Sequence, residues 1–383
     1  MTVTAPAGFD AAGIAAGIKR TGALDLAVVV NRGPSQAGAA VFTSNRAMAN
    51  PIIWSKQVIL DGVVTAVVLN SGGANCFTGP EGFQVTHRTA EAAASALGAS
   101  AGDVLVCSTG LIGDQLDGEI LEEGVLSAVN RLSAGGGEDA ARAIMTTDSV
   151  PKTVIVDGAG WRIGGMAKGA GMLAPGLATM LVVLTTDADL AAGELDGALR
   201  EATRLTFDRL DSDGCMSTND QVTLLASGAS GVRPPIEEFT EALVRACDEL
   251  AAKLQADAEG ASHEITIEVV GAVSESDAVE VGRSVARNNL FKAAIFGNDP
   301  NWGRVLAAIG TTAAEFDPYL VDVSMNGVRV CHAGRPDRPR EEVDLTPRAT
   351  TVRIELHAGE ASATIRTNDL THDYVHENSA YAS

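Results

Sequence analysis

The chain has 383 residues, 46% of them hydrophobic and 4% aromatic, and its 49 acidic against 28 basic residues give a formal net charge of −21. A chain of this length and composition is globular and can bury a large core, as two domains or as one large α/β unit. The negative charge argues against nonspecific electrostatic binding to nucleic acid or to an anionic membrane, because both would repel the protein.

The first half of the chain is predicted to consist of short apolar strands separated by turns and a few helices. Apolar runs of strand length occur at Leu24–Val30, Ala39–Thr43, Val63–Leu69 and Val104–Cys107. Helical spacing of apolar residues occurs at Val85–Leu97 and Leu116–Leu132. The segment Gly164–Met172 is rich in glycine, carries one lysine at Lys168, and is expected to be flexible.

The second half repeats this alternation and ends in a polar tail. Further strands are predicted at Met180–Leu184, Val222–Ala226, Ile265–Val270, Leu320–Ser324, Val352–Leu356 and Ala363–Arg366. Further helices are predicted at Leu195–Thr206 and at Ile236–Gln255, the second of which is amphipathic. Strands that alternate with helices favour a layered α/β sandwich.

The sequence indicates neither a membrane anchor nor a disulfide framework. No stretch approaches the ~20 apolar residues that a membrane helix needs, and the amino terminus lacks the basic region and apolar core of a signal peptide. The five cysteines are scattered and never form a C-x-x-C pair, so no zinc site is indicated either. Cys215 is interpreted as a packed free cysteine rather than a nucleophile. We expect a cytoplasmic protein.

A threonine at the start of an apolar strand is the candidate catalytic nucleophile. Thr179 follows the turn residues Pro175 and Gly176 and precedes the apolar run Met180–Leu184. Attack of its hydroxyl on the Ala178 carbonyl, followed by hydrolysis of the ester, would cut the chain before Thr179. The new α-amino group, with a pKa of roughly 8, would then act as the base for the hydroxyl of the same residue. Alternatively, Thr179 merely opens a strand, where β-branched residues are favoured.

Three other clusters carry groups suited to the same chemistry. Thr109 and Gly110 follow the strand Val104–Cys107 and offer backbone N–H groups beside a hydroxyl, as an oxyanion hole requires, although a plain turn is the alternative. Thr146 could bind substrate through its hydroxyl or simply close a turn. Glu259 could hold a cationic amine or be a solvated residue at a helix end.

Seven separated blocks carry a resemblance to a known family. The most specific is Lys168–Leu181, which reads Lys-Gly-x-Gly-Met-x-x-Pro-x-x-Ala-Thr-Met-Leu. The supporting blocks are Asn70–Asn75, Ser108–Gly110, Thr146–Asp148, Glu259–Ala261, Asp299–Arg304 and Asp369–Tyr374. In content and order they resemble the ornithine acetyltransferase family, also called bifunctional glutamate N-acetyltransferase. Family members often have asparagine and methionine at Gly176 and Leu177, a departure that leaves the scissile pair intact.

The resemblance implies a self-cleaving α/β sandwich of the N-terminal-nucleophile type, with a smaller C-terminal α/β part. Cleavage between Ala178 and Thr179 would give an α chain of residues 1–178 and a β chain of residues 179–383. Thr179 is implied as the nucleophile, with Thr109 and Gly110 stabilising the oxyanion. The implied substrate contacts are Thr146, Lys168, Thr179, Glu259, Asn378 and Ser383.

The implied reaction is a ping-pong acetyl transfer. Thr179 takes the acetyl group of N2-acetylornithine, ornithine leaves, and glutamate takes the acetyl group to give N-acetylglutamate. The charges suggest that Lys168 pairs with the substrate carboxylate and Glu259 with a cationic amine. No metal or organic cofactor is needed, and acetyl-coenzyme A would be a second acetyl donor if the enzyme is bifunctional. The family suggests an assembly of two α and two β fragments.

Two other functions remain open at this point. An N-terminal-nucleophile amidohydrolase or aminopeptidase would cut itself in the same way but transfer the acyl group to water. A small-molecule binding protein built on this fold would keep a single intact chain.

Overall fold

A computed structural model describes residues 2–174 and 180–380 of the chain. These residues form two compact units, each of which is described by itself. The first unit comprises residues 2–170, 180–208 and 216–254, and the second comprises residues 171–174, 209–215 and 255–380.

The first unit contains two β-sheets. One has the strand order β1-β2-β4-β5, formed by β1 (Phe9–Ile14), β2 (Leu26–Asn31), β4 (Ala66–Asn70) and β5 (Val104–Ser108). The other has the order β3-β9-β8-β7-β6, formed by β3 (Ala37–Phe42), β9 (Gln221–Ala226), β8 (Leu181–Thr186), β7 (Arg162–Lys168) and β6 (Lys152–Asp157). Neighbouring strands are antiparallel except for the parallel pairs β4–β5 and β8–β9.

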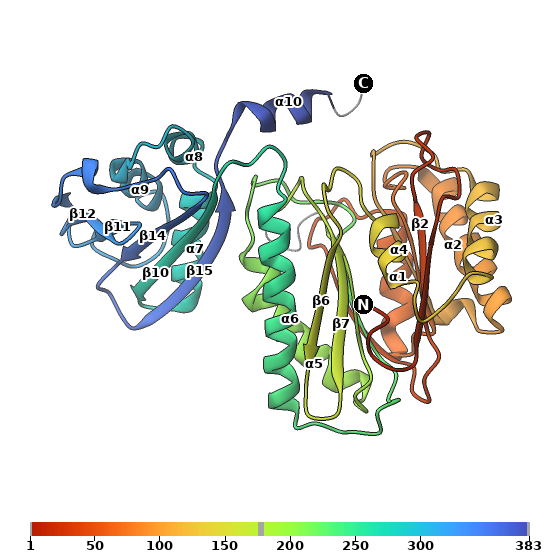
Figure 1. The fold of residues 1–383 in the computed structure, drawn as a ribbon. Coiled ribbons are helices and arrows are strands. Elements are labelled where there is room, and N and C mark those ends of the chain that lie inside the picture. Colours follow the sequence, from red (N-terminus) through yellow and green to blue (C-terminus); the bar gives the residue numbers. More distant parts are fainter. Residues whose placement is uncertain (1, 175–179, 381–383) are drawn as a thin grey trace. The chain divides into compact units, whose positions relative to one another are not determined.

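An apolar core joins the two sheets, and helices cover their outer faces. The core contains Val67 and Leu105 from one sheet and Val183 and Leu225 from the other. Outside the first sheet lie α2 (Gly79–Leu97) and α3 (Gly118–Val129), and outside the second lie α5 (Ala192–Leu205) and α6 (Ile236–Ala256) (Figure 1). Two shorter helices, α1 (Asn50–Val58) and α4 (Gly137–Ala143), pack on β5 and on β1 and β2. The first unit is therefore a four-layer sandwich, which confirms the layered α/β architecture predicted from the sequence.

Local sequence accounts for the main elements of this unit. All six residues of β2, Leu-Ala-Val-Val-Val-Asn, are buried, because a strand covered on both faces reads as one continuous apolar run. Helix α3 begins where Asp117 accepts hydrogen bonds from the N–H groups of Glu119 (2.9 Å) and Ile120 (3.3 Å). Helix α2 ends at Gly98, whose φ of +67° is the left-handed conformation that glycine adopts readily.

The second unit is the smaller C-terminal α/β part. Its sheet has the order β13-β12-β11-β14-β10-β15, formed by β10 (Glu264–Ala272), β11 (Asp322–Met325), β12 (Val328–His332), β13 (Arg335–Pro336), β14 (Ala349–Glu355) and β15 (Ala361–Asn368). Its helices are α7 (Glu275–Ala286), α8 (Asn289–Phe296), α9 (Trp302–Ile309) and α10 (His372–Ala380). Ile267 and Ile354 share one core with Phe291 and Ile309, whereas alternate residues of β14, such as Arg353, are exposed. One face of this sheet is therefore buried and the other is polar.

The two expected cleavage fragments do not coincide with the two compact units. Strands β7 and β8 pair as an antiparallel hairpin, from Ile163 opposite Thr186 to Lys168 opposite Leu181. The connection between them contains the Ala178–Thr179 bond. Residues before and after this bond therefore supply neighbouring strands of one sheet.

Most strands predicted from the sequence are confirmed with ends shifted by a few residues, but the expectation of a flexible Gly164–Met172 segment is wrong over its first half. Residues up to Lys168 form β7, in the interior of a sheet. A Cβ on Gly164 would lie 2.4 Å from the Thr2 carbonyl oxygen, and one on Gly165 would lie 2.8 Å from the Leu184 side chain. These glycines therefore serve close packing rather than mobility.

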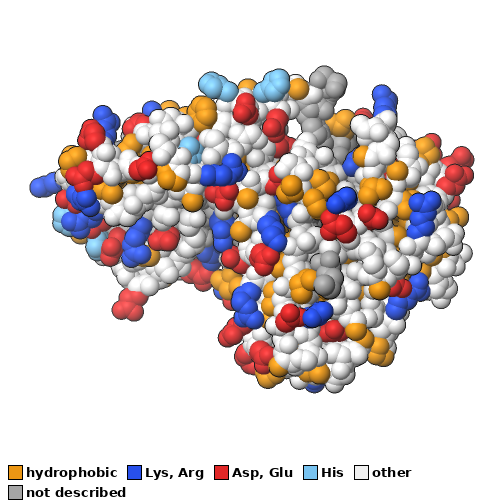
Figure 2. Space-filling view, viewed as in Figure 1, with side chains coloured by type: hydrophobic (Ala, Val, Ile, Leu, Met, Phe, Trp, Pro, Cys, Tyr) orange, Lys and Arg blue, Asp and Glu red, His pale blue; other side chains and the backbone are white. Residues whose placement is uncertain are grey.

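The surface carries charges of both signs. On the face shown in Figure 2, acidic side chains in red and basic side chains in blue are interspersed. The net charge of −21 is thus not gathered into one patch on this face. Within residues 2–174 and 180–380, no helix has the length and apolar character required to cross a membrane.

Candidate active site

The turn after β5 places two predicted site residues in a rigid backbone. Thr109 is 3% exposed, and its N–H donates to the Asn70 carbonyl oxygen at 3.0 Å. Gly110 has a φ of +135°, and a Cβ at this position would lie 2.7 Å from the Gly73 backbone nitrogen. Only glycine fits this close approach of two backbones. The backbone of the turn is therefore held in one conformation, as a candidate oxyanion hole requires.

Replacing Gly110 with alanine is expected to lower the rate of the acetyl transfer that the sequence resemblance implies by about 10²- to 10³-fold, the loss typical of one oxyanion donor. The added methyl group would collide with the Gly73 backbone and displace the turn. Gly113 is the matched control, because its φ is +92° but nothing lies within 4 Å of an added Cβ. Steady-state rates of the two variants, with thermal melts to verify folding, make the comparison. Equal rates for both would contradict this assignment.

Lys168 lies at the end of β7 and reaches the same turn. Its side chain is fully buried, and Nζ donates to Thr109 Oγ1 at 3.1 Å. An ammonium group can only donate, so Thr109 Oγ1 is the acceptor in this hydrogen bond. The lysine charge therefore polarises the hydroxyl of a predicted oxyanion residue.

A buried carboxylate stands at the centre of this part of the first unit. Asp148 Oδ1 accepts from Lys152 Nζ at 2.6 Å and from the Gly169 N–H at 2.7 Å. Its Oδ2 accepts from the Thr146 N–H at 3.0 Å. Burial alone would raise the pKa of Asp148, but the charges of Lys168 and Lys152 and the Gly169 N–H outweigh it and lower that pKa. Asp148 therefore stays ionised and holds Thr146 in place.

Two adjacent residues directly before β9 connect the turn after β5 with Met180, the residue that follows Thr179. Asn219 Nδ2 donates to the carbonyl oxygens of Ser108 (2.8 Å) and Ala74 (2.6 Å). Asp220 is fully buried, and its Oδ1 accepts from the N–H of Met180 at 3.1 Å. Met180 directly follows Thr179 in the chain. Burial raises the pKa of Asp220 well above its usual value, although the Met180 N–H and the Lys168 charge act in the opposite direction.

The second unit brings two further predicted residues together. Asn378, on α10, donates from Nδ2 to Glu259 Oε2 at 2.9 Å. A Cβ on Gly171 would lie 2.4 Å from the same Glu259 oxygen, so glycine at this position leaves room for the carboxylate. A second carboxyl group, Asp213, accepts from the Met172 N–H at 2.7 Å. This part of the second unit can therefore present acidic groups to a cationic amine.

Cys215 lacks the surroundings of a reactive thiol. Its side chain is exposed, so the interpretation of Cys215 as a packed cysteine is wrong, and all five cysteines are free. Partial burial, followed by the charges of Asp213 and Asp211, raises the pKa of the Cys215 thiol. A raised pKa disfavours the nucleophilic thiolate.

The structure places six of the predicted site residues. Thr109, Gly110, Thr146 and Lys168 lie in the first unit, and Glu259 and Asn378 lie in the second. Ala178, Thr179 and Ser383 lie outside the described residues. Sequence reasoning did not assign a role to Asp148, Asn219 or Asp220. Asn219 and Asp220 are polar residues that adjoin a predicted strand, which is common in loops, and Asp148 is signalled by its place in the Thr146–Asp148 block.

Comparison with known proteins gives a family. A model described as the ArgJ family matches residues 10–383. The "Arginine biosynthesis bifunctional protein ArgJ" of Streptomyces coelicolor is 62% identical over 383 residues, which cover 100% of both chains. The protein of the same name from Mycobacterium tuberculosis is 54% identical over 389 residues, which cover 100% of this chain and 96% of that one.

Solved structures of similar sequence carry related names. A crystal structure of ornithine acetyltransferase from Mycobacterium tuberculosis, complexed with ornithine, is 55% identical, covers 47% of this chain and 96% of that chain, and has a TM-score of 0.45. A Bacillus halodurans arginine biosynthesis bifunctional protein is 34% identical, covers 51% of this chain and 97% of that chain, and has a TM-score of 0.49. The full-length sequence matches confirm the resemblance found in the sequence blocks. The chain belongs to the ArgJ family and is an acetyltransferase enzyme of arginine biosynthesis.

Proposed function

We propose that the chain cuts itself between Ala178 and Thr179 and carries acetyl groups as an ester on Thr179, from N2-acetylornithine to glutamate. The single observation that carries this proposal is the buried Lys168–Thr109 hydrogen bond of 3.1 Å beside Gly110. This hydrogen bond supplies an activated oxyanion donor. The same unit holds β8, whose first residue, Leu181, follows Thr179 by two positions. The full-length similarity to ArgJ proteins supports the choice of substrates.

The first half-reaction forms the acetyl ester. The α-amino group of Thr179 removes the hydroxyl proton as Oγ1 attacks the acetyl carbonyl of N2-acetylornithine. Because Lys168 occupies Thr109 Oγ1 as a donor, the Thr109 O–H is left to donate to the developing oxyanion. Collapse of the tetrahedral intermediate breaks the C–N bond, and the α-amino group returns the proton to the departing amine of ornithine.

The second half-reaction reverses these steps with glutamate. The glutamate amine attacks the ester carbonyl, the same donors stabilise the oxyanion, and Thr179 leaves with its proton restored. Glu259, held by Asn378 at 2.9 Å, is proposed to bind the side-chain ammonium of ornithine. The buried position of Lys168 favours a role on Thr109 over the direct pairing with the substrate carboxylate that charge alone suggested.

Acetyl-coenzyme A is proposed as a second acetyl donor, since the relatives are named bifunctional proteins. The resemblance also supports a cytoplasmic assembly of two α and two β fragments. Strand pairing between β7 and β8 is expected to hold one α and one β fragment together after cleavage. Size-exclusion chromatography with light scattering would give the native mass of this assembly.

Denatured intact-mass measurement tests the cleavage and the intermediate together. We expect fragments of 178 and 205 residues that elute together under native conditions and separate in denaturant. Brief incubation with N2-acetylornithine, or separately with acetyl-coenzyme A, should add one acetyl group to the larger fragment only. A single unbroken chain that gains nothing would refute the Thr179 mechanism. If added glutamate yields only free acetate, the amidohydrolase alternative is correct.

A further inference from the structure

The polar face of the second unit's sheet carries a group of histidines and carboxylates outside the region described above. Asp322 begins β11, and it lies directly opposite Glu355 at the end of β14. His357 follows Glu355 by two residues, and His332 ends β12, the strand on the other side of β11. Three neighbouring segments thus bring four possible metal-binding side chains to one edge of the sheet.

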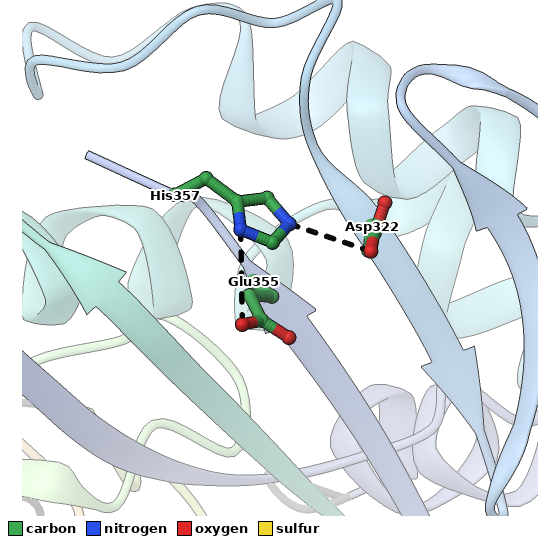
Figure 3. A group of neighbouring side chains, drawn as sticks. All are labelled: Asp322, Glu355 and His357. Atoms are coloured by element: carbon green, nitrogen blue, oxygen red, sulfur yellow. Dashed lines mark ion pairs between the residues drawn. The ribbon is translucent and has the colours of Figure 1, made fainter. Parts of the chain in front are cut away.

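His357 lies between the two carboxylates, as Figure 3 shows. Its Nε2 is 3.3 Å from Asp322 Oδ2, and its Nδ1 is 3.8 Å from Glu355 Oε1. One ligand atom from each of these three side chains lies within 4.8 Å of the other two. Two ligand atoms on a tetrahedral Zn²⁺ are about 3.4 Å apart, given metal–ligand distances near 2.1 Å. The 3.3 Å between Asp322 Oδ2 and His357 Nε2 already matches this value. The distances from Glu355 to the other two ligand atoms would have to shorten slightly.

The group combines one fixed carboxylate with two adjustable side chains. Asp322 Oδ1 accepts from the Ala333 N–H at 2.8 Å and pairs with His332 Nδ1 at 2.9 Å, which leaves Oδ2 facing His357. The Asp322 side chain is only 10% exposed, whereas those of Glu355 and His357 are each 42% exposed. The two exposed side chains can therefore move onto an ion that Asp322 anchors.

The nearby charges permit a cation. Arg329 approaches Asp322 Oδ2 with one nitrogen at 3.7 Å, but its Nε is engaged by Asp337 at 2.7 Å. The negative charges of Asp322 and Glu355 beside the histidine are therefore opposed by one arginine, Arg329, which lies closer to Asp337 than to Asp322. One imidazole and two carboxylates form a donor set suited to a divalent transition metal, with a fourth position left for water.

We propose that Asp322, Glu355 and His357 bind one divalent transition-metal ion, for which Zn²⁺ is the best match. His332 is a positioning residue in this site, since its ring hydrogen-bonds Asp322 Oδ1 and directs Oδ2 toward the metal. The ion would link β11 to the end of β14 and stabilise the folded second unit, because the unfolded chain does not hold these ligands together. This site is independent of the function proposed above.

Isothermal titration of the full-length protein without an affinity tag, using ZnCl₂, tests the site. We expect one Zn²⁺ per chain, a rise in melting temperature, and a Co²⁺ absorption band typical of four-coordinate geometry. His357→Asn should weaken binding at least tenfold, because asparagine tolerates the φ of +53° at this position but lacks the imidazole. Glu355→Gln should weaken binding as well, and His332→Gln should have a smaller effect.

His87→Asn is the matched control. His87 is also a half-exposed histidine beside a carboxylate, with Nε2 3.6 Å from Glu91, but within residues 2–174 and 180–380 it forms no ion pair with a second carboxylate. This variant should bind Zn²⁺ as the unaltered protein does. Absence of stoichiometric binding to the unaltered protein would overturn the proposal. So would unchanged affinity in both His357→Asn and Glu355→Gln, which would place the ion elsewhere.

Discussion

Replacement of Thr179 with alanine is expected to leave a single chain of 383 residues and to lower acetyl transfer on the order of 10³-fold or more. The variant lacks both the hydroxyl that attacks and, because cleavage fails, the terminal amine that serves as its base. Denatured intact mass and the rate of N-acetylglutamate formation are the measurements.

Thr179→Ser is the control, since serine retains the hydroxyl at the same position. We expect it to cut itself and to form an acetyl ester. Two fragments from the alanine variant would show that another residue starts cleavage. Normal transfer by an uncut alanine variant would remove Thr179 from the mechanism altogether.

Replacement of Asp148 with alanine is expected to destabilise the first unit by about 3–5 kcal/mol, the loss typical of breaking a buried ion pair. Lys152 and Lys168 are each 1% exposed, so the variant leaves buried positive charge without the carboxylate between them. Asp157→Ala is the matched control, because Asp157 pairs with Arg162 at 2.8 Å on the surface with a 67% exposed side chain. Exposed pairs contribute about 1 kcal/mol or less.

The stability difference for Asp148→Ala should also depend on pH. The pKa of Asp148 is lower in the folded protein than its unfolded value of about 3.9. Its contribution is therefore fully present above that unfolded value and is lost as the pH falls through the folded pKa. Denaturant titrations at pH 7 and below pH 4 should show the gap between the two proteins narrowing in acid. A gap that is constant over this range would rule out an ionised Asp148 as the cause.

The strands that the sequence predicts best are those whose buried residues form continuous apolar runs. Strands β2, β4 and β8 were predicted because helices and a second sheet cover both their faces. Strand β6 was missed because it begins at Lys152, a buried lysine that pairs with Asp148. Strand β7 was missed because its two glycines are usual turn formers, and only their neighbours in space show why they are needed.

The site residues likewise differ in how far the sequence alone predicts them. The turn chemistry of Thr109 and Gly110 is local, so the sequence pointed to it directly. Asn219 and Asp220 depend on partners distant in the chain, and Asp148 combines the nearby Lys152 and Thr146 with Gly169, 21 positions away. The Asn219 bond to the Ala74 carbonyl oxygen joins residues 145 positions apart, and the Glu259–Asn378 bond joins residues 119 apart. No periodicity or spacing rule predicts such pairs; they exist only once the sheets have formed.

The hydrogen bond between the Met180 N–H and Asp220 has a consequence for turnover. The proposed cleavage before Thr179 would create a new amino terminus, and chain ends ordinarily lose conformational freedom each time they engage a substrate. The second residue of that new chain would be Met180, whose N–H donates to Asp220 at 3.1 Å, and the third would be Leu181, the first residue of β8. Under the proposed mechanism only one residue would precede this hydrogen bond, so Thr179 would lose less conformational entropy on reaching the acetyl carbonyl than a residue at the end of a longer free segment. The proposed cut would thus leave its new amino terminus directly before a strand that is already paired in the sheet.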